Sequence, residues 1–218
     1  GGACLVHNSK ARKTEALILQ KADEGARRLG IDRREFLASS MGMATTLVRA
    51  GFTVQGYDIN PQAQERFTTA WGVGVATPAA AAQGVDVLVV MVVSAEQVES
   101  VLFGQFGNDA AATLAPGAVI MVCSTVAPAF ARDLGERLQS QGLHLLDAPV
   151  SGGVARAAEG KLSMMISGAP IAFERCEPLL AVLAERVYRI GDEAGQGSTV
   201  KMINQLLAGV HIAAAAEA

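Results

Sequence analysis

The sequence predicts an α/β protein built on a doubly wound, Rossmann-type and mostly parallel sheet. The apolar runs at residues 85–93 and 118–122, and a further strand pattern at 144–148, are separated by segments with the composition of helices. A run that is apolar throughout is typical of a parallel strand, because helices cover both of its faces. Strands that alternate with helices along the chain favour a single sheet with helices on both sides.

The remaining elements follow in chain order from apolar spacing and from turn residues. We expect further strands over residues 53–58, 73–75, 162–166 and 187–190. We expect helices over residues 43–50, 62–70, 94–103, 129–141 and 170–185, a short one after Pro78, and a last one from Ser198 to the end of the sequence. Proline precedes or begins several of these helices because its fixed φ suits the first turn.

The first 39 residues differ from the rest of the chain. Asn8 or Ser9 is a suitable cap for a helix over residues 10–29 that is polar on most sides. Arg33-Arg34 then lie in a stretch that resembles a twin-arginine export signal. Such a signal requires an uncharged hydrophobic stretch after it, and Arg49 interrupts that stretch here. We therefore expect a cytoplasmic protein, with export as the alternative.

Composition excludes several classes of function. The net charge of −3 and the aromatic content of 5% give no basic stripe or stacking platform for nucleic acid. The three cysteines and three histidines are too scattered for a disulfide framework or a metal site. The apolar run at 85–93 is only nine residues long and contains Asp86, so it cannot span a bilayer.

A small-residue motif, Ser151-Gly152-Gly153, follows the predicted strand at 144–148. Two adjacent glycines let backbone N–H groups approach an anionic ligand, because no Cβ atom stands in the way. The hydroxyl of Ser151 supplies one more donor. The motif therefore predicts a site that holds a carboxylate by main-chain groups, and a plain turn between two strands is the alternative.

In the predicted C-terminal helix, Lys201 and Gln205 stand four residues apart and so share one face. The residues around them are apolar: Val200, Met202, Ile203, Leu206 and Leu207. A lysine in such surroundings loses hydration, which lowers its pKa toward the range of a general base. The alternative is a surface lysine whose aliphatic stem lies along apolar neighbours.

Taken together, the stretches at 147–168 and 195–218 resemble the β-hydroxyacid dehydrogenase family, and the second is most similar to its L-threonate dehydrogenase branch. The resemblance covers residues 40–218 and implies NAD-dependent oxidation of a small hydroxy-carboxylic acid of the L-threonate or 3-hydroxyisobutyrate type. It assigns general acid/base catalysis to Lys201, substrate orientation to Gln205, and carboxylate binding to the Ser151 motif. It also implies a full-length protein that forms a homodimer or a larger homo-oligomer.

The family's cofactor fingerprint is a strand, then Gly-x-Gly-x-x-Gly, then a helix. Met41 and Gly42 match its second half, whereas Leu37 and Ser39 stand where the first two glycines belong. Fusion of a foreign N-terminus to a truncated dehydrogenase explains this departure, and a naturally divergent fingerprint is the alternative. The same departure leaves a second function open, that of a catalytically inactive remnant of an NAD-binding domain.

An acidic residue, Asp58, ends the predicted strand at 53–58. In a dinucleotide fold such an acid accepts hydrogen bonds from the adenosine ribose and repels a 2′-phosphate. Asp58 therefore favours NAD over NADP as the cofactor. The alternative role is to cap the helix that begins near Pro61.

Two more strand ends complete the predicted cofactor site. Met91, Val92 and Val93 end one apolar run, and open α/β sheets bind their ligands at the carboxyl ends of strands. The family resemblance places the nicotinamide half of the cofactor near Thr125. We accordingly divide the chain into an atypical segment at 1–39, a dinucleotide-binding domain at 40–197, and the start of a long helix at 198–218 whose all-helical domain is missing.

Overall fold

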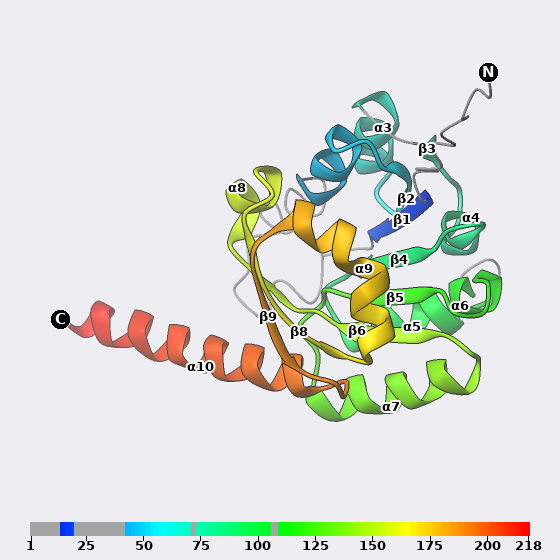
Figure 1. The fold of residues 1–218 in the computed structure, drawn as a ribbon. Helices are drawn as coiled ribbons and strands as arrows, with labels where there is room; N and C mark the ends of the chain where they lie inside the picture. The colour runs from blue at the N-terminus through cyan, green and yellow to red at the C-terminus, as the bar shows by residue number, and fades with distance from the viewer. Residues whose placement is uncertain (1–13, 20–41, 71–72, 106–108) are drawn as a thin grey trace, which may run out of the picture.

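The structure, a computed structural model, describes residues 14–19, 42–70, 73–105 and 109–218. In these ranges nine strands form one sheet in the order β3-β2-β1-β4-β5-β6-β8-β7, and β9 pairs with β8 (Figure 1). The strands are β1 Thr14–Leu19, β2 Thr53–Asp58, β3 Val73–Gly74, β4 Val87–Met91, β5 Val119–Val122, β6 His144–Asp147, β7 Val150–Ser151, β8 Leu162–Gly168 and β9 Ala184–Gly191. The pairs from β3 to β6 are all parallel, whereas β8 runs antiparallel to β6 and β7. The predicted fold class is confirmed.

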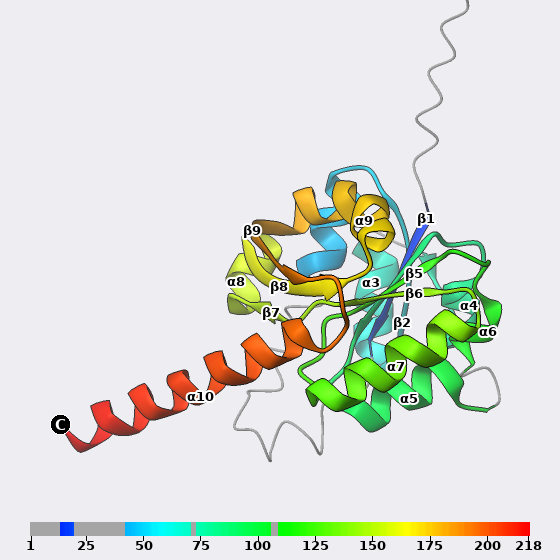
Figure 2. The ribbon, with the colours of Figure 1, turned by 60° about the horizontal axis from the view of Figure 1, so that its bottom comes forward.

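Helices cover both faces of this sheet. They are the helix at 42–49, α3 Pro61–Ala70, α4 Pro78–Ala82, α5 Ala95–Phe103, α6 Ala110–Thr113, α7 Pro128–Ser140, α8 Gly153–Ala158, α9 Pro170–Leu183 and α10 Gln196–Glu217. Figure 2 shows α9 and the helix at 42–49 on one side of the sheet, and α5 and α7 on the other.

Strand β4 explains why its sequence is apolar throughout. Val87, Val89 and Met91 belong to the core beneath α9, and Leu88 and Val90 belong to the core beneath α5 and α7. Successive side chains of a strand point to opposite faces, so both sets must be apolar when both faces are covered. All five residues of β4 are buried.

The N-terminal prediction is wrong where the structure describes it, because residues 14–19 form strand β1 rather than part of a helix. This strand pairs in parallel with β2 from Thr14↔Thr53 to Leu19↔Asp58, and with β4 from Glu15↔Val87 to Leu19↔Met91. Pairing along both edges outweighs local helix preference, which is a weak determinant when tertiary contacts oppose it.

The remaining N-terminal predictions, including Arg33-Arg34, Leu37 and Ser39, lie outside the described residues. Short elements that the sequence analysis did not predict are α6, α8 and β7. The domain boundaries at 39/40 and 197/198 stay predictions.

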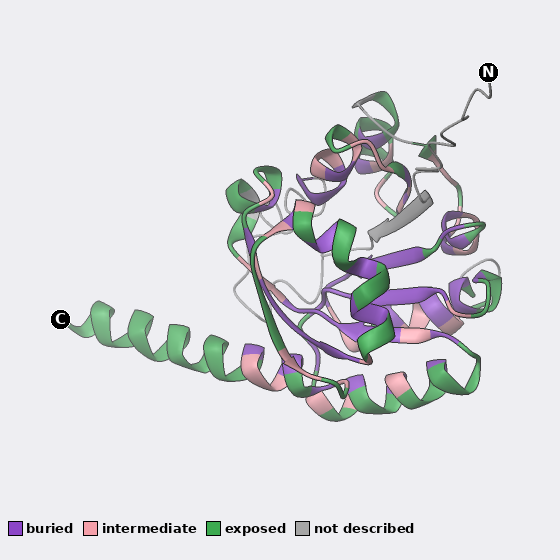
Figure 3. Cartoon of the chain, in the orientation of Figure 1, coloured by how far each residue is buried: buried purple, intermediate pink, exposed green. Residues whose placement is uncertain are grey.

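Helix α10 leaves the body of the protein after its first turns (Figure 3). Its buried residues are Gly197, Ser198 and Lys201, and every residue from Met202 onward is exposed. Among the residues that the structure describes, none of the helices combines the length and the apolar composition needed to cross a membrane.

Candidate active site

The carboxyl ends of β4 and β5 lie side by side, as predicted for the residues around Val92 and Thr125. The buried Ser124 accepts a hydrogen bond at Oγ from the Val92 N–H at 3.0 Å, and Gln97 Oε1 accepts one from the Val93 N–H at 2.8 Å. The N–H groups of Val92 and Val93 are therefore already hydrogen-bonded to side chains of the protein. Thr125 is exposed beyond Ser124 and faces solvent at this edge. The roles of Ser124 and Gln97 were missed, since nothing in the local sequence separates them from other polar loop residues.

Asp58 lies at the same edge of the sheet, at the end of β2, and is 5% exposed. Its Oδ1 accepts a hydrogen bond from the Asn60 N–H at 2.7 Å, which fixes the turn after the strand. Asn60 Oδ1 in turn accepts one from the Gln62 N–H at 3.0 Å. Asn60 is therefore the residue that caps α3, and Asp58 sets the turn that leads to it.

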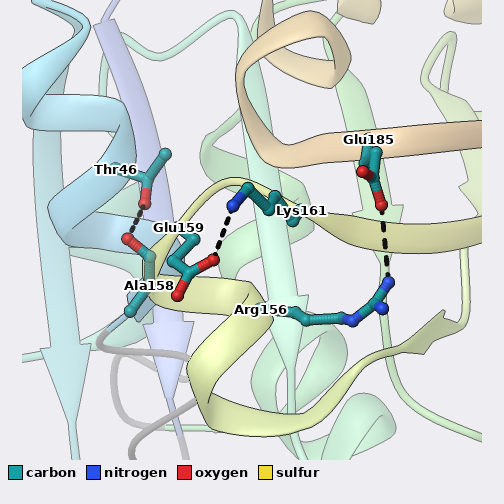
Figure 4. Close-up of polar contacts among 6 residues, drawn as sticks. All are labelled: Thr46, Arg156, Ala158, Glu159, Lys161 and Glu185. Atoms are coloured by element: carbon teal, nitrogen blue, oxygen red, sulfur yellow. Dashed lines mark hydrogen bonds and ion pairs between the residues drawn. The ribbon is translucent and has the colours of Figure 1, made fainter.

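Gly42 begins the helix at 42–49 and lies against α8. A Cβ atom added at Gly42 would be 2.8 Å from the Ala158 nitrogen, so only glycine allows this approach. Thr46 Oγ1 lies within hydrogen-bond reach of the carbonyl oxygens of Ala157 and Ala158, at 3.2 Å from each. Figure 4 shows the contact with Ala158. The predicted cofactor residue Gly42 is thus packed on the helix that follows the Ser151 motif. Met41 lies outside the described residues.

The Ser151 motif forms the connection from β7 to α8. Gly152 and Gly153 have φ values of 137° and 66°, which L side chains rarely adopt. A Cβ atom added at Gly153 would meet nothing within 4 Å, so the backbone there borders open space. Backbone conformation therefore requires both glycines, and the open side leaves room for a ligand.

An ion pair supports α8 from outside. Arg156 Nη1 lies 3.4 Å from Glu185 Oε2, and both side chains are about half exposed (Figure 4). Pairs of this kind contribute at most about 1 kcal/mol in water. The position of α8 consequently depends more on its packing against Gly42 and Thr46.

Lys201 is 6% exposed, and burial lowers the pKa of its amine. The predicted direction of the pKa shift and its predicted cause, loss of hydration, both agree with the structure, but the residues that bury the amine are not the predicted ones. Met202 and Leu206, which were expected to surround the amine, are 53% and 66% exposed. Lys201 is buried because the start of α10 packs against β8, β9, β6 and α7. Gln205 is exposed, since α10 has already left the body there.

Strand β8 brings the Ser151 motif and the start of α10 together. Ser151 pairs with Ser163 of β8, and a Cβ atom at Gly197 would lie 2.5 Å from the carbonyl oxygen of Met165 of the same strand. The two predicted motifs, more than forty residues apart in the sequence, therefore lie against positions two residues apart on one strand.

A buried carboxylate that the sequence analysis did not assign joins these two motifs. Asp147 ends β6, is 1% exposed, and accepts hydrogen bonds at Oδ2 from the N–H groups of Gly195 at 3.0 Å and Ser198 at 2.8 Å. Its Oδ1 accepts a hydrogen bond from the Ser198 hydroxyl at 2.6 Å. Burial raises the pKa of Asp147, and the hydrogen bonds from Ser198, Gly195 and Ser167 oppose that rise.

A cavity of about 340 Å³ lies at the opposite end of β6. Its lining includes Arg132, Gly135, His144, Gly168 and Ala194, and none of the predicted site residues. Ligands of open α/β sheets bind at the carboxyl ends of the strands, so we do not assign this cavity to the active site. Within the described ranges, no group of three or more His, Cys, Asp or Glu residues could hold a metal ion.

The chain is similar to a known protein family and to several dehydrogenases. Residues 39–191 match a protein family described as the NAD binding domain of 6-phosphogluconate dehydrogenase. An L-threonate dehydrogenase of Cupriavidus necator is 52% identical over 181 residues, which are 83% of this chain and 60% of that protein. A 3-hydroxyisobutyrate dehydrogenase of Pseudomonas aeruginosa is 35% identical over 176 residues, which are 81% of this chain and 58% of that protein.

Solved structures give the same result for the fold. The crystal structure of a 3-hydroxyisobutyrate dehydrogenase from Salmonella typhimurium superposes with a TM-score of 0.81 at 41% identity. The superposition covers 94% of this chain and 65% of that one. The chain thus spans about 60% of the length of the curated relatives that it matches.

Proposed function

Because this chain belongs to the β-hydroxyacid dehydrogenase family, we propose that it oxidises a small hydroxy-carboxylic acid with NAD as the electron acceptor. L-threonate is the first substrate to test, since two L-threonate dehydrogenases are 52% and 51% identical in sequence to this chain over 83% and 82% of its length. 3-Hydroxyisobutyrate is the second. The observation that carries the proposal is the burial of Lys201 in helix α10, whose start lies against β8, the strand that also pairs with Ser151.

The Ser151 motif is proposed to bind the substrate carboxylate. The backbone at Gly153 borders open space, and the hydroxyl of Ser151 adds a donor that can rotate toward an oxygen. Charge-assisted hydrogen bonds to a carboxylate are roughly twice as strong as neutral ones. A substrate held in this way presents its hydroxyl group on the side of β8 where α10 begins.

Lys201 is proposed to act as the general base, with Gln205 orienting the substrate through its amide. Burial favours the neutral amine, which can accept the proton of the substrate hydroxyl. As the carbon–oxygen bond becomes a carbonyl, the hydrogen on that carbon departs as hydride. NAD supplies the hydride acceptor when it is bound.

The cofactor would lie along the carboxyl ends of β2, β4 and β5. Asp58 fits the adenosine end, because its buried carboxylate stands where a dinucleotide fold needs an acceptor for ribose hydroxyls. Thr125 and the chain at Met91–Val93 would border the nicotinamide half. Gly42, at the start of its helix, would lie beside the phosphates.

The proposed reaction is tested by following NADH formation at 340 nm with the purified chain. L-threonate, 3-hydroxyisobutyrate and L-serine serve as substrates. The blank is a hydroxy acid of similar charge that has no hydrogen on the carbon bearing its hydroxyl group, so it cannot give up a hydride. Turnover of L-threonate with the highest kcat/KM is the expected result. NAD binding by calorimetry without turnover of any hydroxy acid would instead favour the non-catalytic NAD-binding module.

Replacing Asp58 with asparagine is expected to reduce the preference for NAD over NADP by 10-fold or more. The variant keeps an oxygen for the Asn60 N–H but removes the negative charge that repels a 2′-phosphate. A lost charge-assisted hydrogen bond to ribose is worth about 1.5–3 kcal/mol, or roughly 10- to 100-fold in affinity. Dissociation constants for both cofactors, measured by fluorescence, give the ratio.

Asp86→Asn is the matched control, because Asp86 is an exposed acid just before β4, at the opposite edge of the sheet. It should leave the ratio of the two dissociation constants unchanged. An unchanged ratio in Asp58→Asn would remove Asp58 from the cofactor site.

A further inference from the structure

Helix α10 is attached to the body through its first residues, and a single carboxylate makes most of the polar part of that attachment. Asp147 accepts hydrogen bonds from the N–H groups of Gly195 and Ser198 and from the Ser198 hydroxyl. Ser167 Oγ donates to Asp147 Oδ2 at 3.4 Å and accepts from the Gly197 N–H at 2.9 Å. The N–H groups of Gly195, Gly197 and Ser198 at the start of α10 therefore donate to two side chains of the sheet, Asp147 and Ser167.

The hydrogen bonds of this arrangement oppose the effect of burial, which raises the pKa of Asp147. The first N–H groups of a helix have no partners within the helix and carry partial positive charge, so they stabilise a nearby anion. The distance of 2.6 Å from Ser198 Oγ to Asp147 Oδ1 is typical of a hydroxyl that donates to a charged oxygen. Asp147 thus holds α10 by hydrogen bonds from the N–H groups at the positive end of the helix and from the Ser198 hydroxyl.

The hydrogen bonds of Ser198 also fix the position of Lys201. The two residues are three apart in α10, so they lie on the same face, and both are buried. The residues that follow Lys201 are all exposed, so the buried contacts of this helix lie in its first turns, up to Lys201. The position of the Lys201 amine consequently depends on the hydrogen bonds one turn before it.

Asp147 is also connected to the Ser151 motif through the chain. Only Ala148, Pro149 and Val150 separate the two residues, and the Pro149 carbonyl accepts a hydrogen bond from the Met165 N–H at 3.1 Å. One end of this short connection holds α10 and the other carries the motif. Displacement of Asp147 would therefore change the separation of the two groups proposed to act on the substrate.

We propose that Asp147 is a positioning residue, which through Ser198 holds the Lys201 amine at a fixed place relative to the Ser151 motif. The inference rests on the proposed function for its catalytic consequence, but the geometry itself can be tested without catalysis. A displacement of about 1 Å of a catalytic group can lower a rate by roughly 10²-fold. Variants of Asp147 and Ser198 should therefore lower kcat with little effect on NAD affinity.

The test uses Asp147→Ala, Asp147→Asn and Ser198→Ala in the complete chain. Asparagine can keep an oxygen toward the two N–H groups and donate from its amide to Ser198 Oγ, so it should retain more activity than alanine. We expect kcat to fall about 100-fold in Asp147→Ala and about 10-fold in Ser198→Ala, with Asp147→Asn closer to wild type than Asp147→Ala. The NAD dissociation constant should stay within about twofold, because the proposed cofactor residues lie on other strands.

The second readout is the titration of Lys201, followed by NMR after reductive methylation of lysines with ¹³C-formaldehyde. Lys161 is exposed and pairs with Glu159, so its signal is a reference within the same chain. In Asp147→Ala and Ser198→Ala the pKa of Lys201 should move toward the ordinary lysine value as the amine gains hydration. Ser140→Ala, which removes an exposed serine that bonds only to the Arg137 carbonyl of its own helix among the contacts described, should change neither readout.

The two readouts separate this proposal from the proposed function. Retained activity in a Lys201 variant would reject the general-base role, while the titration would still decide whether Asp147 fixes the amine. An unchanged Lys201 titration and unchanged kcat in Ser198→Ala would overturn the positioning role. Ser198→Ala decides the matter even where Asp147→Ala does not fold, because it keeps the backbone hydrogen bonds to Asp147.

Discussion

Replacing Lys201 with alanine is expected to lower kcat for NADH formation by about 10²–10⁴-fold, the contribution of a well-placed general base. The substrate hydroxyl would then have to release its proton to water at the moment when hydride leaves. The affinity for NAD should not change, since Asp58, Thr125 and the end of β4 are not altered. Stopped-flow absorbance for the rate and calorimetry for NAD binding measure the two effects separately.

The general-base role of Lys201 also predicts the direction in which the rate changes with pH. Burial lowers the pKa of Lys201, so the neutral amine is present at a lower pH than for an ordinary lysine. Because the base must be neutral, kcat/KM should rise as pH rises through this lowered pKa and then reach a plateau. Lys201→Ala should lose that rise.

Lys161→Ala is the matched control, since Lys161 is exposed and its amine lies 2.9 Å from Glu159 Oε2. Hydrogen bonding and the charge of Glu159 raise the pKa of Lys161, the opposite direction to Lys201. This variant should keep both kcat and the pH profile. A Lys201→Ala enzyme within threefold of the wild-type rate would contradict the proposed mechanism.

The parts of the fold that were predictable are those in which burial leaves a local pattern. The apolar run of β4 could be identified because both of its faces are covered, and the predicted bounds of β2 match the structure. Proline at the first position of α4, α7 and α9 fixed where those helices start. In each case the information lies within about ten residues of the chain.

Strand β1 was not predictable in this way. Its six residues, Thr14–Leu19, carry the charged Glu15 and follow polar residues, so the local pattern resembles a helix as much as a strand. What makes it a strand is the gap between β2 and β4, whose residues lie more than thirty positions later in the chain. Pairing partners so distant leave no trace in a window of the sequence.

In the candidate site, too, some features were predictable from the local sequence and others were not. Positive φ at Gly152 and Gly153 was foreseeable from two adjacent glycines, since glycine is the residue that adopts this conformation readily. The role of Asp147 was not, because its partners include the N–H groups of residues 48 and 51 positions away. Backbone donors have no side-chain signature. Only Ser198 could have hinted at this contact.

The second large effect is expected at Gly197, where alanine should destabilise the protein although it favours helix formation. Alanine in a helix interior is better than glycine by about 1 kcal/mol. The added Cβ, however, would lie 2.5 Å from the Met165 carbonyl oxygen and 2.8 Å from that of Asp147. Both are backbone atoms of buried strands that cannot turn aside, and overpacking of this kind costs typically about 1–3 kcal/mol.

The overpacking cost less the helix gain leaves up to about 2 kcal/mol, so we expect Gly197→Ala to lower the melting temperature by up to about 8 °C, given roughly 2–4 °C per kcal/mol for a chain of this size. The start of α10 would also move away from β8, so Lys201 would leave its place and kcat would fall by about 10²-fold. Differential scanning calorimetry and the NADH assay measure the two effects.

Gly209→Ala tests the same substitution in the same helix without the clash. Gly209 is exposed, and a Cβ atom there would meet nothing within 4 Å, so only the helix preference remains. This variant should raise the melting temperature by up to about 4 °C and leave kcat unchanged. Opposite signs at the two glycines would mean that contact with the sheet, and not helix propensity, determines the effect at Gly197. Equal stabilisation at both would mean that α10 does not press on Met165 and Asp147, and Lys201 would then have no fixed place beside the Ser151 motif.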